Sequence, residues 1–359
     1  MRRLLFLLCV MMMAIVPLSA QDIQTDLDNL LADYAEADGP ALVVQVTTPD
    51  GTWIATTGLA DGERPTAPDD RFRIASMSKT YVATVTLMLV EDGIFALDDL
   101  ASDWLSDEIV ENIANADVVT IRQLLAMRSG IDDYLGTDEF WEAIENNPSY
   151  EWTAEEAISY AYGLPALFAP DEEYYYSNSN YILLQLILEN ASGMTLAELI
   201  REKILDPLGL ENTYTQISET HPEGFVNGYE DIDGDGELDD VTNINDGAGL
   251  GDGGLVSNTA DITIFYQALL QDRTLLGDAM MTELLTFSDD DEGGGYSLGL
   301  AEWDTEFGTA WGHSGAVLGF FSIGVYLPAD EMIIVVLSAG GDVYLDELAE
   351  AIGSIVLGE

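Results

Sequence analysis

A lysine inside an apolar helical run constrains this chain more than any other feature. The run RFRIASMSKTYVATVTLMLVEDG contains Lys79, one of only two lysines among 359 residues. Lys79 follows Ser76 by three residues, and residues at that spacing lie on one face of a helix. A serine hydroxyl becomes a nucleophile only beside a base, so the pair predicts Ser-Lys chemistry. The alternative is a chance match in which Lys79 lies on the surface.

The first twenty residues have the pattern of a secretory signal peptide. Two arginines precede an apolar stretch over residues 4–16, and Leu-Ser-Ala at 18–20 forms a cleavage site before Gln21. The stretch is short for a bilayer, so we expect cleavage, a secreted or periplasmic protein and no stable membrane span. Cys9, the only cysteine, falls in this segment. Residues 21–359 then have no disulfides, thiol catalysis or cysteine metal sites.

Acidic residues dominate the predicted mature chain. Residues 21–359 hold 9 basic and 66 acidic side chains, a net charge of −57. Such a surface repels nucleic acid and anionic membranes, which excludes both as partners. Because the chain is also 48% hydrophobic and its acidic residues are dispersed, it is predicted to fold rather than to stay disordered. The composition resembles that of secreted halophilic proteins.

Hydrophobic periodicity predicts an α/β (α+β) fold. Strand patterns lie near both ends of the chain, at 41–47, 52–57, 296–302, 309–313, 320–326 and 332–338. Helical patterns lie at 22–37, 76–91, 121–127, 154–162, 181–189, 259–270 and 343–356. This order predicts one α/β lobe formed from both termini and one inserted all-α lobe at about 92–260. A cleft between lobes is the natural place for a site.

A second polar motif, Tyr176-Ser177-Asn178, stands in a loop directly before a predicted helix. The Tyr176 phenol has the chemistry to shuttle a proton, and the Asn178 amide to orient Lys79 and a substrate carbonyl. The alternative interpretation is an aromatic loop in which Ser177 or Asn178 caps the helix.

A third motif, His313-Ser314-Gly315, lies in WGHSGAVLGFFSIGVYL, where one strand ends and before the next begins. Gly315 permits close backbone approach, and the N–H of Ala316 is placed to complete an oxyanion hole. A backbone N–H at Ser76, near the start of its helix, would be the other donor. The alternative is a histidine in an ordinary turn.

Together, in this order, the three motifs resemble those of the penicillin-recognising serine hydrolases. The likeness is to the serine β-lactamase-related group of D-alanyl-D-alanine carboxypeptidases, class C β-lactamases and esterases. VTIRQLLAMRSGIDDY and GLGDGGLVSNTADITIF support it, and it extends over about residues 41–339. The resemblance implies a β-lactamase/transpeptidase-like fold, an antiparallel sheet flanked by helices with an inserted all-α lobe.

The resemblance also implies a role for each motif residue. Ser76 would be the acylated nucleophile and Lys79 its base partner. Tyr176 would pass a proton to the leaving group, and Asn178 would orient the substrate. His313 stands where many relatives have lysine, a variant also found among carboxypeptidases and esterases of the family. The oxyanion hole would consist of the two backbone N–H groups named above.

Two departures from the family pattern concern the substrate. Relatives that bind a carboxylate commonly carry a hydroxyl residue where this chain has Ala316. A carboxylate-binding arginine after a Gly-Leu-Gly-Leu-like strand is also missing, because residues 297–300 are followed by Ala301 and a glutamate. The chain therefore offers few groups that could bind a substrate carboxylate, unless Arg122 or Arg128 reaches the cleft.

An acidic run, DIDGDGELDD, matches the first part of a calcium-binding loop. Asp231, Asp233, Asp235 and Asp239 would supply ligands, and a glycine occupies the sixth place. The twelfth place, where a bidentate Glu is expected, is Thr242. The run therefore predicts a structural calcium site, with an acidic surface loop as the alternative.

These features predict an exported serine hydrolase that acts through an acyl-enzyme on an amide or ester bond of a small molecule or peptide. The expected activity is similar to that of D-alanyl-D-alanine carboxypeptidases and β-lactamases, without a cofactor for catalysis. The alternatives are an esterase of the same fold and a non-catalytic penicillin-binding-like module. A Ser-His-Asp hydrolase that uses His313 as base is disfavoured, since the chain lacks a Gly-x-Ser-x-Gly elbow.

The net charge predicts that salt stabilises the folded protein, because counter-ions screen its self-repulsion. We expect the Tm to rise between low and molar sodium chloride, measured by circular dichroism. A Tm that is flat or falls over this range would contradict the interpretation.

Overall fold

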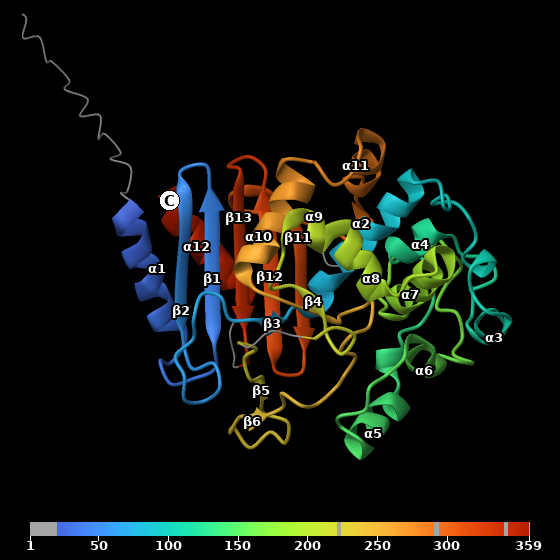
Figure 1. The fold of residues 1–359 in the computed structure, drawn as a ribbon, viewed down its shortest axis with the longest axis horizontal. Helices are drawn as coiled ribbons and strands as arrows, with labels where there is room; N and C mark the ends of the chain where they lie inside the picture. Colours follow the sequence, from blue (N-terminus) through green and yellow to red (C-terminus); the bar gives the residue numbers. More distant parts are fainter. Residues whose placement is uncertain (1–19, 221–223, 291–293, 341–343, 359) are drawn as a thin grey trace, which may run out of the picture.

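In the computed structural model, which describes residues 20–220, 224–290, 294–340 and 344–358, an eight-stranded antiparallel sheet forms the centre of the fold (Figure 1). Its strand order is β2-β1-β13-β12-β11-β10-β9-β8. The strands are β1 (Leu42–Thr48), β2 (Gly51–Thr57), β8 (Ser288–Asp289), β9 (Gly295–Tyr296), β10 (Ala301–Thr305), β11 (Gly308–Val317), β12 (Phe320–Leu327) and β13 (Met332–Ser338). Since β1 pairs with β13, segments from the two ends of the chain lie side by side.

The predicted signal peptide, residues 1–20, lies outside the described residues except for Ala20, which begins helix α1 (Ala20–Tyr34). Helix α12 (Leu345–Leu357) closes the chain beside α1. Over the described ranges, each helix is too short or too polar to span a bilayer.

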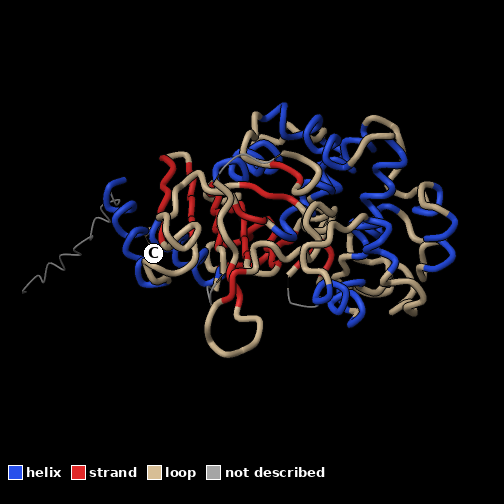
Figure 2. The backbone as a smooth tube through the Cα atoms, turned by 60° about the horizontal axis from the view of Figure 1, so that its bottom comes forward, coloured by secondary structure: helices blue, strands red, loops and turns tan. Residues whose placement is uncertain are grey.

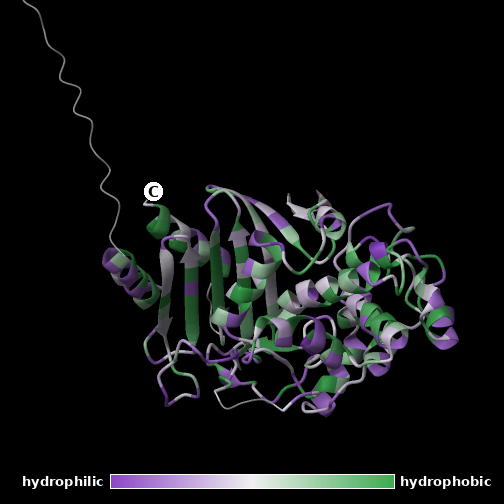
Figure 3. Ribbon diagram, turned by 45° about the horizontal axis from the view of Figure 1, so that its top comes forward, coloured by the Kyte–Doolittle hydropathy of each residue, from purple (hydrophilic) through white to green (hydrophobic). Residues whose placement is uncertain are grey.

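Strands β1, β12 and β13 are buried along most of their length. Successive side chains of a strand point to opposite faces, so the sheet is covered on both sides at these strands. On β1, Val44 belongs to a hydrophobic cluster with α1 and α12, whereas Val43 belongs to a second cluster on the other face. Helix α10 (Thr259–Tyr266) covers that other face, where Gln45 of β1 donates a hydrogen bond to Thr263 at 3.0 Å. Figure 3 shows hydrophobic residues concentrated along the central strands.

A second region consists of helices and loops, which Figure 2 shows beyond the strands. Its centre is formed by α2 (Ser78–Glu91) and α7 (Ser179–Ser192), which pack together and are buried along most of their length. The other helices are α3 (Asp107–Asn112), α4 (Ile121–Leu125), α5 (Asp138–Asn146), α6 (Ala154–Ser159), α8 (Leu196–Ile200), α9 (Asp206–Leu208) and α11 (Asp278–Leu284). The boundary of the helical lobe at about 92–260 stays a prediction.

Two small sheets lie outside the large one. One has the order β3-β7-β4, with β3 (Phe72–Arg73), β7 (Leu255–Ser257) and β4 (Tyr214–Thr215). The other is the hairpin of β5 (Tyr229–Glu230) and β6 (Asp239–Asp240), which carries the acidic run. The antiparallel sheet flanked by helices that the resemblance implied is confirmed.

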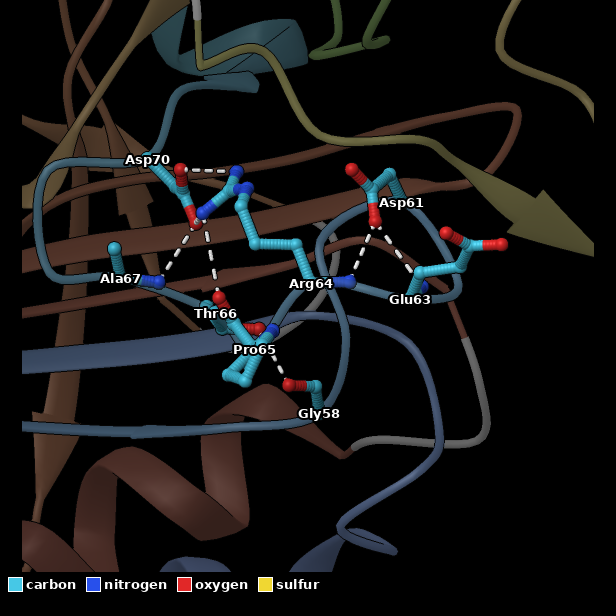
Figure 4. A network of polar contacts seen from close by, with 8 residues as sticks. All are labelled: Gly58, Asp61, Glu63, Arg64, Pro65, Thr66, Ala67 and Asp70. Atoms are coloured by element: carbon cyan, nitrogen blue, oxygen red, sulfur yellow. Dashed lines mark hydrogen bonds and ion pairs between the residues drawn. The ribbon is translucent and has the colours of Figure 1, made fainter.

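A local polar network holds the segment between β2 and β3 (Figure 4). The Arg64 guanidinium donates to both carboxylate oxygens of Asp70, at 3.0 and 2.7 Å, and the N–H of Ala67 donates to the same carboxylate at 2.7 Å. Asp61 accepts the backbone N–H of Arg64 at 2.7 Å. Because this segment leads directly into β3 and the turn of Ser76, the network restricts where that turn can lie.

The predicted strand at 296–302 is wrong. The chain forms two strands instead, with β9 ending at Tyr296 and β10 beginning at Ala301. Gly299 between them has a φ of +76°, and the N–H of Ser297 donates to the carbonyl of Leu300 at 2.9 Å. A positive φ at glycine closes a turn and interrupts the extended backbone that period-two patterning implies.

Candidate active site

Ser76 lies on a tight turn at the start of α2. The turn is a 3₁₀ segment, Ala75–Met77, and it is anchored by the N–H of Ile74, which donates to the carbonyl of Leu255 at 3.0 Å. Ala75 has a φ of +48°, a conformation that residues with a Cβ rarely adopt. Such backbone strain is often found at functional sites, where surrounding contacts hold it in place. Here it leaves Ser76 partly exposed between two buried neighbours.

Strand β11 lies directly against this turn. A Cβ on Gly315 would come within 2.5 Å of the Ile74 carbonyl oxygen and 2.8 Å of the Ser76 nitrogen. The approach expected at Gly315 is therefore present, and it requires glycine for steric reasons. From β12, the Ser322 hydroxyl donates to the Ile74 carbonyl at 2.8 Å. Two strands of the large sheet thus support the backbone of Ser76.

The edge of β11 beyond Gly312 faces the site. β10 pairs with residues 308–312 of β11, while residues 313–317 pair with β12 alone. Alternate N–H groups along such an edge point away from the sheet, which is the arrangement an oxyanion hole needs. Ala316 lies on this edge with an exposed side chain that offers no polar group. The oxyanion role of Ser76 and Ala316 stays a prediction.

The Lys79 amine is completely buried and bonded to three oxygens. Its Nζ lies 2.9 Å from the Ser76 Oγ, 2.8 Å from the Asn178 Oδ1 and 2.6 Å from the backbone oxygen of Asp252. The last two oxygens are acceptors only, so each requires an N–H of Lys79. A neutral amine has two N–H groups, and its lone pair then points to the third partner, the Ser76 hydroxyl. The geometry therefore suits Lys79 as the base for Ser76.

Burial lowers the pKa of Lys79 to about 8, against the raising effect of the Asp252 and Asp133 carboxylates. Desolvation disfavours an ammonium, whereas nearby negative charges favour it. A usable fraction of the amine is therefore neutral near physiological pH. The apolar residues that flank the Ser-x-x-Lys motif therefore contribute to the burial that lowers the pKa of Lys79.

Asn178 links Lys79 to a buried carboxylate. The Asn178 Oδ1 accepts from Lys79, and its Nδ2 donates to Asp133 at 2.8 Å, which fixes the orientation of the amide. The side chain does not cap α7, although Asn178 precedes that helix. The structure therefore brings the second motif to the first, and the helix-capping alternative for Asn178 is wrong.

The hydroxyl of Tyr176 is buried and has no hydrogen-bond partner among the described residues. Burial raises the pKa of this phenol, which the neighbouring Ser76 hydroxyl partly opposes. The Lys79 Nζ lies 5.0 Å from the centre of the tyrosine ring. A protonated phenol beside the Ser76 hydroxyl is available to donate to a leaving group, but it is a poor base in the free protein.

His313 is buried beside Tyr176, with ring centres 6.2 Å apart. Its Nδ1 faces the carbonyl of Ser314, so Nδ1 carries the proton and Nε2 accepts from the Tyr296 hydroxyl at 3.1 Å. Burial and the charge of Lys79 lower the pKa of His313 to about 3. The ring is thus neutral and weakly basic, which disfavours His313 as the base that activates Ser76.

The five candidate catalytic residues of the three motifs lie in or directly behind one pocket of about 700 Å³. Ser76, Tyr176, Asn178 and His313 line it directly, whereas Lys79 lies buried behind Ser76. Its lining also includes Tyr344 and, in the first turn of α12, Leu345, Asp346 and Glu347. The structure places these side chains together, and their catalytic roles stay predictions.

Neither Arg122 nor Arg128 lines this pocket. Arg122 forms ion pairs with Asp98 and Glu283, at 2.7 and 2.6 Å, and Arg128 pairs with Asp171 at 3.6 Å. These pairs hold both arginines in the helical region, so neither supplies a carboxylate-binding charge to the pocket.

Sequence reasoning missed several polar residues of the site. Asp133, Asp252 and Tyr296 bond to the motif residues or to their partners, and Arg73 and Asp246 line the pocket. Asp133 and Asp252 stand in the two supporting segments of the chain. The signal that could have indicated them is an acidic residue within a segment that supports the family resemblance. The burial of these residues beside Lys79, however, depends on contacts that no local sequence pattern encodes.

The calcium-loop residues lie away from this pocket, on the β5–β6 hairpin. Among the described residues, Asp231, Asp233 and Asp235 place one carboxylate oxygen each within 4.8 Å of one another. Asp239 does not join this group and instead pairs with Glu230 across the hairpin. The Asp231 carboxylate accepts the N–H groups of Gly234 and Gly236, at 2.8 and 3.0 Å. Calcium binding here stays a prediction.

A family comparison agrees with the geometry of the site. Residues 27–356 match the protein-family model Beta-lactamase. The chain belongs to the β-lactamase family. All three motifs fall within the matched residues, so the family resemblance predicted from them is confirmed.

Two curated proteins are similar to this chain over part of its length. Penicillin-binding protein 4* of Bacillus subtilis is 33% identical over 223 residues, which cover 58% of this chain and 47% of that protein. D-aminopeptidase of Brucella anthropi is 29% identical over 270 residues, 73% of this chain and 49% of that protein. The chain thus spans about half the length of these relatives.

Solved structures show the same fold over nearly the whole chain. A D-stereospecific amidohydrolase from Streptomyces superposes with a TM-score of 0.80 at 25% identity, over 95% of this chain and 99% of that one. A D-amino acid amidase from Ochrobactrum anthropi, solved with L-phenylalanine amide, has a TM-score of 0.79 at 24% identity, over 94% and 98%. A hydrolase fold of the β-lactamase family is therefore shown.

Replacing Lys79 with Ala tests which group activates Ser76. We expect kcat/KM to fall by roughly 10³-fold or more, because the serine loses its base. In the unchanged protein, kcat/KM should rise with pH through about 8, since only neutral Lys79 accepts the proton. Hydrolysis of a p-nitrophenyl ester over a pH series measures both.

The matched control is Lys203→Ala, which removes the other lysine. Lys203 pairs with Asp92 at 2.6 Å away from the pocket, so its loss should leave the profile unchanged. Full activity in Lys79→Ala would show that Lys79 is not the base and would favour the alternative in which His313 is.

Proposed function

We propose that this protein is a serine hydrolase that cleaves amide or ester bonds through an acyl-enzyme on Ser76. The observation that carries the proposal is the buried Lys79 amine, which lies 2.9 Å from the Ser76 Oγ and has two other partners that only accept. In its neutral form the amine therefore has its lone pair directed at the Ser76 hydroxyl. Lys79 takes the hydroxyl proton while Oγ attacks the substrate carbonyl. Backbone N–H groups of Ser76 and Ala316 hold the tetrahedral oxyanion.

Collapse of this intermediate breaks the bond to the leaving group, which takes a proton from Lys79 through Tyr176. Water then attacks the acyl-serine, returns a proton to Ser76 and releases the acid. Besides the substrate and water, these steps use only side chains and backbone groups of this chain. We also propose export to a secreted or periplasmic location, on the pattern of residues 1–20.

The charges of the pocket favour a substrate that carries an amine rather than a carboxylate. Among the described residues, its lining includes four acidic side chains, Asp246, Asp252, Asp346 and Glu347. It includes one basic side chain, Arg73, while Lys79 lies buried behind Ser76. Arg73 donates to Gln216 and to two backbone carbonyls, each at 3.0 Å, so its guanidinium is already engaged. A free carboxylate would meet repulsion and no available cation.

We therefore favour an amidase or aminopeptidase that takes substrates with a free amine over a D-alanyl-D-alanine carboxypeptidase. D-aminopeptidase and D-stereospecific amidohydrolase are among the similar proteins, which supports this class. Ala316, with no hydroxyl to hold a carboxylate, supports it too.

Acyl-enzyme formation is tested by intact mass after incubation with a fluorescent penicillin in molar salt. Because molar salt screens the repulsion of the penicillin carboxylate, we expect an adduct on the unchanged protein. We expect none on Ser76→Ala, since Oγ is the only nucleophile proposed. An adduct that persists in Ser76→Ala would overturn the role of Ser76. Absence of an adduct and of penicillin consumption, with p-nitrophenyl ester turnover intact, would exclude penicillin recognition while keeping the hydrolase.

Substrate charge is tested with D-alanine p-nitroanilide and its N-succinyl derivative, which replaces the ammonium with a carboxylate. We expect kcat/KM to be about 10-fold or more higher for the free amine, given that one hydrogen bond to a charged group is worth about 1.5–3 kcal/mol. Molar salt should reduce the difference by screening. Preference for the succinyl compound would refute the amine-binding assignment.

A further inference from the structure

Asp252 touches Lys79 through its backbone while its side chain lies in the same buried cluster. Its carbonyl oxygen is 2.6 Å from the Lys79 Nζ. Its Oδ2 accepts from the Tyr134 hydroxyl at 2.8 Å, whereas Oδ1 is buried without a hydrogen-bond partner among the described residues. The residue is only 5% exposed. A carboxyl group in this position is both immobile and poorly solvated.

Such a carboxylate does not stabilise the fold by itself. A buried acceptor without a partner costs about 1–3 kcal/mol, and a charged one costs more. The hydroxyl of Tyr134 offsets only part of that cost. The nearby charge of opposite sign is the ammonium form of Lys79, whose pKa the Asp252 carboxylate raises. The benefit of the carboxylate is therefore electrostatic, and it falls on that amine.

A second carboxylate has a comparable relation to the same amine. Asp133 accepts from Asn178, and Asn178 accepts from Lys79, so one side chain separates this carboxylate from the amine. The two carboxylates reach Lys79 from different parts of the chain. Asp133 directly precedes the 3₁₀ turn Tyr134–Gly136, and Asp252 precedes β7.

We propose that Asp252 is a positioning residue for Lys79, whose carbonyl holds the amine and whose buried carboxylate sets the pH at which that amine becomes a base. The effect of Asp252 on the titration of Lys79 is inferred from this cluster alone. Its consequence for catalysis rests on the proposed function. Without the carboxylate, desolvation would act on Lys79 with less opposition.

The direction of the effect follows from the charges around the amine. The groups that face Asp252 are Lys79 from α2, Asp133 and Tyr134 from the loop and turn before α5, and Tyr176 from the loop before α7. Burial raises the pKa of Asp252 to about 6, so the carboxylate is ionised over the range in which Lys79 titrates. Removing its negative charge disfavours the ammonium, which lowers the pKa of Lys79.

Because the chain contains only two lysines, the amine can be observed directly. Protein labelled with ¹³C at the lysine ε position should give two titrating signals, from Lys79 and from Lys203, which serves as internal reference. In Asp252→Asn, which keeps an acceptor for Tyr134, we expect the Lys79 midpoint to fall by about one pH unit, the low end of the effect of a nearby charge. The matched control is Asp246→Asn, another buried pocket carboxylate that does not act on Lys79.

An unchanged or raised Lys79 midpoint in Asp252→Asn, or an equal fall in Asp246→Asn, would overturn the proposal. If Asp252→Asn does not fold, Asp252→Ala replaces it: the negative charge is again removed, so the Lys79 midpoint should again fall. An unmoved midpoint in that variant also overturns the proposal.

Ester hydrolysis is measured on the same samples. We expect the rising limb of kcat/KM against pH to move downward with the Lys79 midpoint. A midpoint that falls in Asp252→Asn while the limb stays in place supports the role of Asp252 toward the amine and counts against Lys79 as the base in the proposed function. The two failures are therefore distinguishable.

Discussion

The structure depends on how the buried amine of Lys79 is satisfied. Burying an unpaired ammonium is prohibitively costly, so a lysine without exposure must be hydrogen-bonded or neutral. Its three partners are Ser76 on the adjacent turn, Asn178 before α7 and the carbonyl of Asp252 before β7. These segments are far apart in the chain, so the amine is satisfied only when the helical region and the small sheet have assembled around α2.

The large sheet supplies the rigid side of the site. Its strands are packed on both faces, which fixes β11 and β12 against the turn of Ser76. Gly315 lets β11 approach to where a methyl group would collide with the Ile74 carbonyl, and Ser322 bonds to that same carbonyl. A nucleophile held between a strand edge and a helix start is positioned by backbone rather than by flexible side chains. This is the support that preorganised donors require.

Several features of the site were predictable because they are local. Ser76 and Lys79 share a helix face, and Gly315 marked a close approach, since both follow from spacing or residue type. The strand predicted at 296–302 failed because one glycine at positive φ, Gly299, outweighed the period-two pattern. Arg122 and Arg128 were candidates for the pocket by charge alone, but ion pairs hold them elsewhere.

The sequence by itself determined the chemistry of the three motifs, the family and the strongly acidic character of the chain. Tertiary structure decided which charges the reacting groups experience: Asp252 and Asp133 lie against Lys79, and His313 is neutral beside Tyr296. The reason is physical. Helix faces and strand alternation are set by neighbours a few residues away. Desolvation and electrostatic interaction depend instead on distance in space between segments that the sequence separates, by 17 residues for Tyr296 and His313 and by 173 for Lys79 and Asp252.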